Sequence, residues 1–153
     1  MSGSLHAWYS LRDLEALAAR QGELTGDVEL ARLPRLSGLL HSTAGSVRAS
    51  LRLRQRGVGR LAATLELTTA VELVCQRCLE PVFEPIAERA ELMFVEPGEA
   101  GASIPEGCEP IELDDGRLLP ARLIEDELIV ALPLVPKHAR VEDCGSLARN
   151  LAT

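Results

Sequence analysis

Three stretches in the middle of the chain alternate between apolar and polar residues. The first runs from Val47 to Leu53, and the second runs from Leu61 to Leu73 with Cys75 in the same phase. This period of two is typical of a strand with one buried face. A third long strand is predicted from about Val82 to Val95. Short connections between three consecutive strands predict an antiparallel meander.

Apolar residues at helical spacing mark a segment near the start of the chain. Ser10 is a good N-cap, and Asp13 follows it at the spacing of a capping box. The apolar stripe that follows consists of Leu11, Leu14, Leu17 and Ala18. Gly22 is expected to end this helix.

A second helix is predicted near the other end, with Pro120 as its first residue. Apolar residues from Ala121 to Leu132 recur at helical spacing, and Pro133 follows them. Because the end of this segment is apolar all round, a helix here is expected to be buried, and periodicity alone leaves a strand open.

The remaining segments are shorter. A short strand is expected around Val28–Leu30, a loop rich in Gly, Ser and Thr over residues 34–45, and a turn at residues 57–59. Pro and Gly interleaved with acids predict a flexible acidic loop over about 96–110, and Ile111–Leu113 is expected to form a short edge strand before an Asp-Gly turn. Residues 145–153 form a tail without a pattern.

The predicted fold class is α+β, with an N-terminal helix, a C-terminal helix and an antiparallel meander that is open or curls into a partly closed barrel. No internal repeat and no composition boundary divides the chain, so a single domain over residues 1–153 is predicted. The first residues lack the basic-then-apolar order of a secretion signal, and no segment has the length of a membrane span. A cytoplasmic protein that does not contact a membrane is therefore expected.

Composition restricts the function further. The net charge is −7 and aromatic residues make up only 3% of the chain. Nonspecific nucleic-acid binders are normally basic overall, so binding of RNA would depend on a local basic face rather than on total charge. Extensive stacking of bases on aromatic side chains is not expected.

The sharpest local motif is the pair Cys75 and Cys78, separated by two residues. Two such sulfurs can bind one tetrahedral metal ion, and His138 with Cys144 would complete a Cys3His set suited to one structural zinc ion. A redox pair is one alternative, and ordinary free thiols are another. Cys108 lies in the predicted acidic loop and is left out of the site.

Arginines concentrate between Ser46 and Arg60, a segment without acids. Alternate residues of a strand share a face, and arginine suits phosphate binding through its planar fork. The candidate contacts with RNA phosphates, including one arginine between the two cysteines, are Arg48, Arg52, Arg54, Arg56, Arg60 and Arg77. The alternative is a solvated sheet face whose arginines pair with Glu66 and Glu72 across strands.

Adjacent acids at Glu125, Asp126 and Glu127 form the last candidate group. They point in different directions around the predicted helix, which indicates a solvated face or a surface for a basic partner rather than one catalytic site. No phosphate-binding glycine loop and no nucleophile elbow is present in the sequence, so no enzyme and no small-molecule substrate is predicted.

Two stretches resemble the large ribosomal RNA subunit accumulation (YceD) family. One is Val74–Pro81, and the other comprises Glu109–Leu113, Ile124–His138 and Asp143–Cys144. The resemblance implies a non-enzymatic role in accumulation of 23S ribosomal RNA and assembly of the large subunit. With this role, the arginine face is expected to contact large-subunit ribosomal RNA or a pre-50S particle, and the acidic residues are expected to contact a basic ribosomal protein. A thiol-redox or RNA-processing enzyme and a purely structural protein–protein adaptor are the alternative functions.

Overall fold

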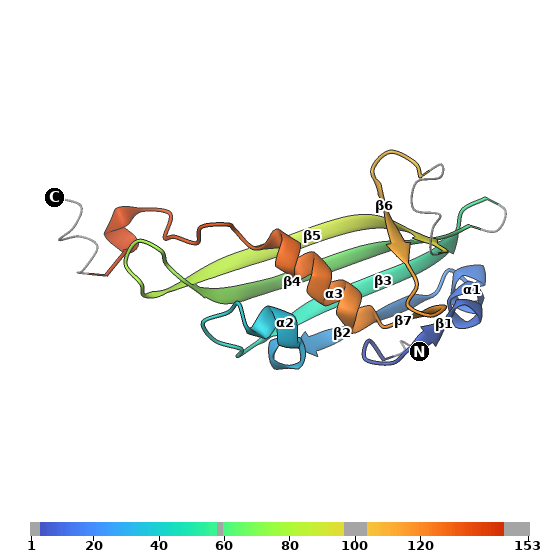
Figure 1. The fold of residues 1–153 in the computed structure, drawn as a ribbon, viewed down its shortest axis with the longest axis horizontal. Coiled ribbons are helices and arrows are strands. Elements are labelled where there is room, and N and C mark those ends of the chain that lie inside the picture. The colour runs from blue at the N-terminus through green and yellow to red at the C-terminus, as the bar shows by residue number, and fades with distance from the viewer. Residues whose placement is uncertain (1–3, 58–59, 97–103, 146–153) are drawn as a thin grey trace.

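A long, twisted β-sheet is the main element of the protein, and helices cover one of its faces (Figure 1). The computed structural model describes residues 4–57, 60–96 and 104–145. In chain order the elements are β1 (Tyr9–Ser10), α1 (Leu11–Ala19), β2 (Glu23–Glu29), a 3-10 turn (Leu30–Arg32), α2 (Pro34–Ser37), β3 (Ser46–Gln55), β4 (Leu61–Val74), β5 (Pro81–Val95), β6 (Cys108–Glu112), β7 (Arg117–Leu118), α3 (Pro120–Ala131) and a 3-10 turn (Val141–Asp143).

Five strands form the sheet in the order β2-β3-β4-β5-β6. The first four are antiparallel neighbours, and Leu51 of β3 pairs with Leu65 of β4. The predicted meander is therefore confirmed, and so is the α+β class. The sheet stays open rather than closing into a barrel, because β2 and β6 lie at its edges. A separate two-stranded ribbon pairs β1 with β7.

The core lies between the sheet and the helices. Alternation along β3 and β4 buries the apolar set that includes Leu53 and Leu65, as a half-buried strand requires. Leu14 of α1 and Leu128 of α3 are fully buried against it. No helix within the described residues is both long and apolar enough to cross a membrane.

The capping box of α1 forms as its sequence predicts. The Ser10 hydroxyl accepts a hydrogen bond from the Asp13 amide (3.1 Å), and the Asp13 carboxylate accepts one from the Ser10 amide (3.0 Å). The helix ends at Ala19, and the left-handed residue after it is Gln21 (φ 51°) rather than Gly22. Gly22 has a different role: a Cβ atom there would lie 3.0 Å from the Leu17 carbonyl oxygen.

Four expectations need correction or extension. Residues 34–45 contain the short helix α2 rather than only a loop, and β6 begins at Cys108 and runs parallel to β5. The end of α3 is helical but not buried all round, because the Val130 side chain is 83% exposed. Residues 58–59 and 146–153, which hold most of one predicted turn and of the tail, lie outside the described part, and so do residues 97–103, the middle of the predicted acidic loop.

Candidate metal centre

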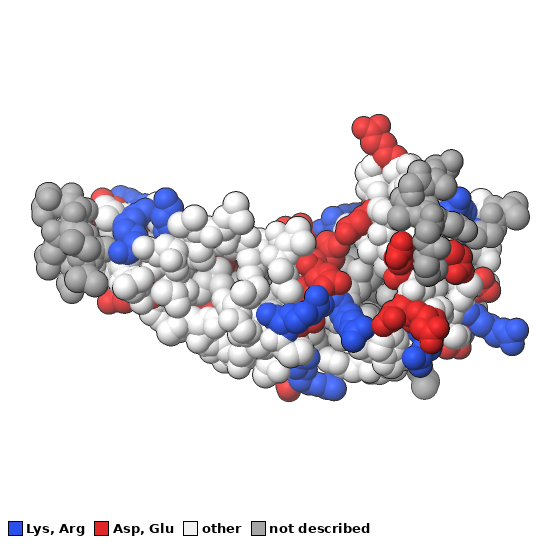
Figure 2. Space-filling view, in the orientation of Figure 1, with Lys and Arg blue, Asp and Glu red and all other residues white. Residues whose placement is uncertain are grey.

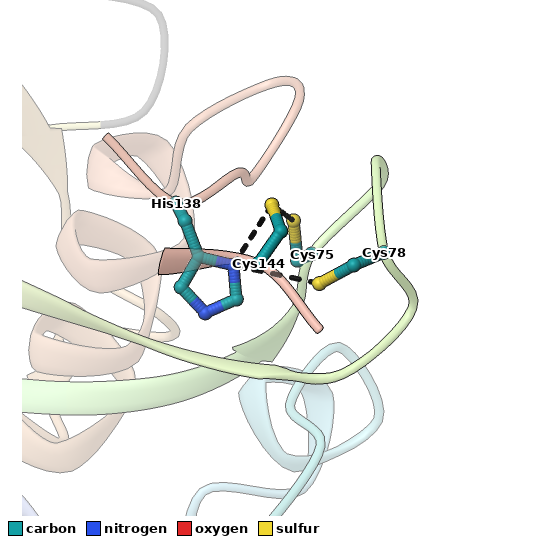
Figure 3. A group of neighbouring side chains, drawn as sticks. All are labelled: Cys75, Cys78, His138 and Cys144. Atoms are coloured by element: carbon teal, nitrogen blue, oxygen red, sulfur yellow. Dashed lines mark hydrogen bonds between the residues drawn. The ribbon is translucent and has the colours of Figure 1, made fainter. Parts of the chain in front are cut away.

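Four side chains from distant parts of the chain converge at one end of the β4–β5 hairpin (Figure 3). They are the sequence-predicted set of Cys75, Cys78, His138 and Cys144, and their ligand atoms all lie within 4.8 Å of one another. The Sγ atoms of Cys75 and Cys144 are 3.9 Å apart. The His138 Nδ1 atom is 3.5 Å from the Sγ of Cys78 and 3.5 Å from the Sγ of Cys144.

These distances fit a tetrahedral metal ion. Zinc binds sulfur at about 2.3 Å and nitrogen at about 2.0 Å, so a zinc tetrahedron has S–S edges of about 3.8 Å and S–N edges of about 3.5 Å. The three separations given above match these edges, and the other pairs of ligand atoms lie within 4.8 Å of each other. The group could therefore hold a metal ion without large rearrangement of its side chains.

Backbone hydrogen bonds shape the turn that carries the first two sulfurs. The Leu79 amide donates to the Cys75 carbonyl (2.8 Å), and the Cys75 amide donates to the Glu80 carbonyl (2.9 Å). Leu79 adopts a left-handed backbone conformation (φ 63°), which is uncommon for a leucine and closes the turn. The Gln76 amide donates to the Pro136 carbonyl (2.8 Å), so the segment after α3 is attached to the same turn.

The ring of His138 is oriented by a second contact. Its Nε2 atom lies 3.1 Å from the Pro81 carbonyl oxygen, which can only accept a hydrogen bond. The Nε2–H tautomer leaves the lone pair of Nδ1 directed at the two sulfurs. Histidine ligands of metal sites are usually held by such an outer hydrogen bond.

The protonation preferences of the thiols are uneven. Burial opposes ionisation of Cys75, but hydrogen bonds from the backbone amides of Cys78, His138 and Arg77 outweigh it and lower its pKa to about 5. Burial and the neighbouring sulfurs of Cys78 and Cys75 raise the pKa of Cys144 to about 11. The group as it stands therefore favours a thiolate at Cys75 over one at Cys144, and a bound cation would favour the thiolate form of Cys144.

Accessibility argues against a redox role for the cysteine pair. Such a role requires a reactive thiol that solvent can reach. The residues Cys75, Cys78 and Cys144 are all buried, with exposed fractions of 0%, 3% and 1%. Cys108 is only partly buried and lies on β6, outside the group.

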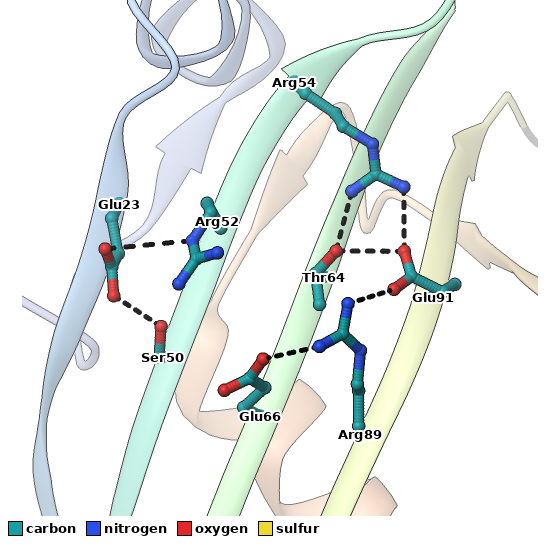
Figure 4. A network of polar contacts seen from close by, with 8 residues as sticks. All are labelled: Glu23, Ser50, Arg52, Arg54, Thr64, Glu66, Arg89 and Glu91. Atoms are coloured by element: carbon teal, nitrogen blue, oxygen red, sulfur yellow. Dashed lines mark hydrogen bonds and ion pairs between the residues drawn. The ribbon is translucent and has the colours of Figure 1, made fainter.

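The predicted arginine face lies on the opposite face of β3 from the buried leucines, and its arginines pair with acids (Figure 4). Arg54 binds Glu91 (2.8 Å), whereas Arg52 lies 3.9 Å from Glu23. Arg48 lies 3.5 Å from Asp27 on β2. The pairing acids of these three arginines thus lie on β2 and β5, and not at the expected Glu66 and Glu72 of β4.

Sequence reasoning missed a further arginine on this face, Arg89 of β5. It binds Glu66 (3.1 Å) and Glu91 (3.3 Å), so Glu66 pairs with Arg89 rather than with an arginine of β3. Arg89 and Glu66 lie directly opposite each other on β5 and β4, where opposite charges attract across the strands. The alternating pattern of β4 and β5 contains the signal for this pair: aligning the two strands as a hairpin places Arg89 opposite Glu66.

Of the other three candidate arginines, Arg56 and Arg60 lie between β3 and β4, and Arg77 lies beyond the opposite end of β4. Arg60 follows the β3–β4 turn, where its carbonyl accepts a hydrogen bond from the Arg56 amide (3.0 Å). Arg77 lies in the cysteine turn at the far end of β4, and its guanidinium is 3.9 Å from the Cys144 sulfur. Arg77 therefore belongs with the cysteine group and not with the arginine face.

Glu125 is buried and not part of a solvated helix face, which corrects the expectation for this residue. Its carboxylate accepts hydrogen bonds from the backbone amides of Arg35 (2.8 Å) and Leu36 (3.2 Å), and from Arg35 Nε (2.9 Å). Leu33, the N-cap of α2, provides no side-chain cap. A carboxylate from α3 thus caps α2, and the exposed Asp126 binds the same arginine (2.6 Å).

Glu127 faces other carboxylates between α3 and the sheet. Burial, a hydrogen bond with Glu109 and the charges of Glu109, Asp126 and Glu88 raise its pKa to about 7. Figure 2 shows acidic side chains gathered between α3 and β6. We name Glu88, Glu109 and Glu127 the acidic cluster.

A Glu127→Gln variant is expected to be more stable than the wild type at about pH 8.5, with a smaller advantage at about pH 6. The folded pKa of Glu127, about 7, lies above the ordinary value of 4.5 for a glutamate, so the folded state keeps a proton that the unfolded state loses. This contribution to stability is present below pH 4.5 and is lost as the pH rises through about 7. Melting temperatures of both proteins at the two pH values measure the effect. An equal advantage at both values would contradict it, and Glu15→Gln, at an exposed position of α1, is the control.

Comparison with known proteins identifies the family. The profile of the family described as Large ribosomal RNA subunit accumulation protein YceD matches residues 63–150. A relative from Haemophilus influenzae with the same description is 40% identical over 81 residues, which cover 52% of this chain and 46% of the relative. The match therefore spans about half the length of that relative, and no solved structure matches. Since the profile matches more than half of the chain and includes all four candidate ligands, the chain belongs to the YceD family.

Proposed function

We propose that this protein supports the accumulation of large-subunit ribosomal RNA in the cytoplasm as a non-enzymatic binding factor. It binds ribosomal RNA or a precursor particle of the large subunit. The observation that carries the proposal is the family match over residues 63–150, together with the name of the relative from Haemophilus influenzae. An open sheet with a charged outer face supports binding rather than catalysis.

One structural zinc ion is the proposed occupant of the Cys3His group. Zinc suits three sulfurs and one imidazole in a closed tetrahedron, and all four positions come from the protein. The ion would attach the segment after α3 to the end of the β4–β5 hairpin. Cys75, Cys78, His138 and Cys144 would hold it, and His138 would keep its outer contact with Pro81.

The proposed RNA contact is a hollow on the outer face of the sheet, of about 570 Å³. We name it the arginine hollow, and its basic side chains are Arg52, Arg54, Arg56 and Arg89. Two acids, Glu91 and Glu106, also line it, and Glu66 pairs with Arg89 beside it. Within the described residues no short ion pair holds Arg52 or Arg56, so these two arginines can attract phosphates even though the whole chain is acidic.

The four arginines of the hollow differ in how firmly ion pairs hold their side chains. Arg54 and Arg89 are both bound to Glu91, so their positions are fixed by the sheet. Arg52 has only a long contact with Glu23, and Arg56 is exposed beside Cys108. Arg52 and Arg56 are therefore the proposed phosphate contacts, and Arg54 with Arg89 fix the shape of the surface.

The acidic cluster is the proposed contact for a basic ribosomal protein. Asp126 lies beside it on the exposed side of α3, whereas the burial of Glu125 removes that residue from the surface. Opposite charges on two faces would allow one small protein to contact RNA and a basic protein in the same particle.

Reversal of two charges, Arg52→Glu with Arg56→Glu, is expected to reduce association with large-subunit precursor particles. Each lost phosphate contact should also lower the slope of log affinity against log salt by about one. Co-sedimentation with precursor particles at a series of salt concentrations measures both quantities.

The matched control is Arg12→Glu, which makes the same type of charge change at an exposed position of α1. The control is expected to sediment like the wild type. Unchanged sedimentation of the double variant, with an unchanged salt slope, would exclude the arginine hollow as the RNA contact.

A further inference from the structure

The sole tryptophan of the chain, Trp8, lies at the surface beside the β1–β7 ribbon. It is 39% exposed. Trp8 lies two residues before Ser10, which pairs with Arg117 of β7. The ribbon therefore brings Arg117 diagonally next to the indole ring.

Two guanidinium groups lie against this ring. The central carbon of Arg117 is 5.0 Å from the ring centroid, and that of Arg122, from the first turn of α3, is 5.5 Å away. Both distances are within the range of cation–π contacts, which hold the flat groups in place. Arg122 also binds Asp114 (3.0 Å), so its position is fixed from a second side.

A cavity of about 230 Å³ opens beside Trp8. Its apolar lining includes Ile111, Leu118 and Leu123. Its polar lining combines the two guanidiniums with carboxylates, and the residues that provide them are Arg117, Arg122, Glu112, Asp114 and Asp126. The site thus offers a flat aromatic surface, positive charge and hydrogen-bond acceptors within one small space.

We propose that Trp8, Arg117 and Arg122 form a platform for one unpaired base of an RNA strand. The proposal rests on the proposed function, RNA binding, and adds a second contact on a different part of the molecule from the arginine hollow. The base stacks on the indole ring, and the guanidiniums neutralise the adjacent phosphate. The carboxylates accept hydrogen bonds from N–H groups on the edge of the base.

Charge complementarity selects a nucleotide over a peptide. Arg122 is already paired with Asp114, and Asp126 with Arg35, so Arg117 and Glu112 are the lining charges that form no ion pair within the described residues. A lysine- or arginine-rich segment would meet the Arg117 guanidinium at the ring, and an acidic segment would give Glu112 no hydrogen-bond donor from its side chains. A nucleotide carries a negative phosphate and also an edge with N–H donors, so it matches both sets of groups. The low aromatic content of the chain excludes an extended stacking surface but is compatible with one platform.

Fluorescence of the single tryptophan provides a direct test. A short single-stranded RNA of mixed sequence is expected to quench Trp8 emission to saturation. The same strand annealed to its complement, and an abasic strand of equal length, are expected to leave the emission unchanged. Equal quenching by all three, or quenching by a poly-lysine peptide alone, would overturn the proposal.

Affinity of labelled single-stranded RNA for variants gives an independent readout. Trp8→Ala is expected to weaken binding roughly tenfold or more, as expected for loss of one stacked base. Trp8→Phe is expected to retain most of the affinity, because a ring remains. Arg122→Gln, a surface change, is expected to weaken binding as well, and Phe83→Ala, at a 68% exposed aromatic elsewhere, is the control.

These results separate the platform from the proposed function. If Trp8→Ala binds single strands as the wild type does and still associates with precursor particles, the platform is excluded and the proposed function remains. If neither protein binds any RNA or any precursor particle, the proposed function fails together with the platform.

Discussion

The Cys144→Ala variant is expected to lose the bound zinc and to melt about 10 °C below the wild type. Zinc binds only the folded protein, and a free concentration a thousandfold above its Kd contributes about 4 kcal/mol to the free energy of unfolding. For a chain of this length each kcal/mol changes the melting temperature by about 2–4 °C. The variant removes one of four ligands whose geometry matches a zinc tetrahedron.

Elemental analysis and thermal melting of untagged protein measure the two effects. The wild type is expected to contain about one zinc ion per chain and to lose stability when a strong chelator is added. Cys108→Ala is the matched control, because Cys108 lies on β6 outside the group, and it should keep both the zinc and the melting temperature. A wild type without metal, with a melting temperature that a chelator does not change, would refute the zinc site.

The Glu125→Ala variant is expected to lower the free energy of unfolding by about 3 kcal/mol. Its carboxylate satisfies the amides of Arg35 and Leu36 at the start of α2, and removal leaves buried donors without an acceptor. The residue is 3% exposed, so water cannot readily replace the lost acceptor. Denaturant unfolding, analysed with a common slope, measures the change.

Asp126 provides the matched control for this prediction. It binds the same arginine at 2.6 Å, but more than half of each side chain in the pair is exposed. Asp126→Ala is therefore expected to cost less than about 1 kcal/mol. If both variants lose the same free energy of unfolding, the contact with the Arg35 side chain stabilises the protein and the cap of α2 does not.

Local patterns predicted the long strands well, because the cause of their alternation is local. The period of two from Val47 to Leu73 records one buried face of a sheet, and β3 and β4 follow it. The chain has only four cysteines and three histidines, so a Cys3His set could be assembled from the sequence by considering each of them. The structure brings Cys75, Cys78, His138 and Cys144 together as that combination requires.

Other features depend on contacts between distant segments, which no local pattern records. The parallel pairing of β6 with β5 is decided by the path of residues between them. The cap of α2 by Glu125 joins positions that are 90 residues apart, and the acids of α3 looked alike in sequence although one is buried. Trp8 gave no sequence signal, because its arginines come from β7 and α3.

The long β4–β5 hairpin has a consequence for how the protein can sit on a large particle. β4 has 14 residues, which correspond to about 45 Å of extended chain. The cysteine turn is at one end of this span, whereas β1, which directly follows Trp8, and β6, whose Cys108 lines the arginine hollow, lie nearer the other (Figure 1). The hairpin therefore holds its two ends at a fixed distance. If both ends contact a particle at the same time, their two contact surfaces on that particle must lie several nanometres apart.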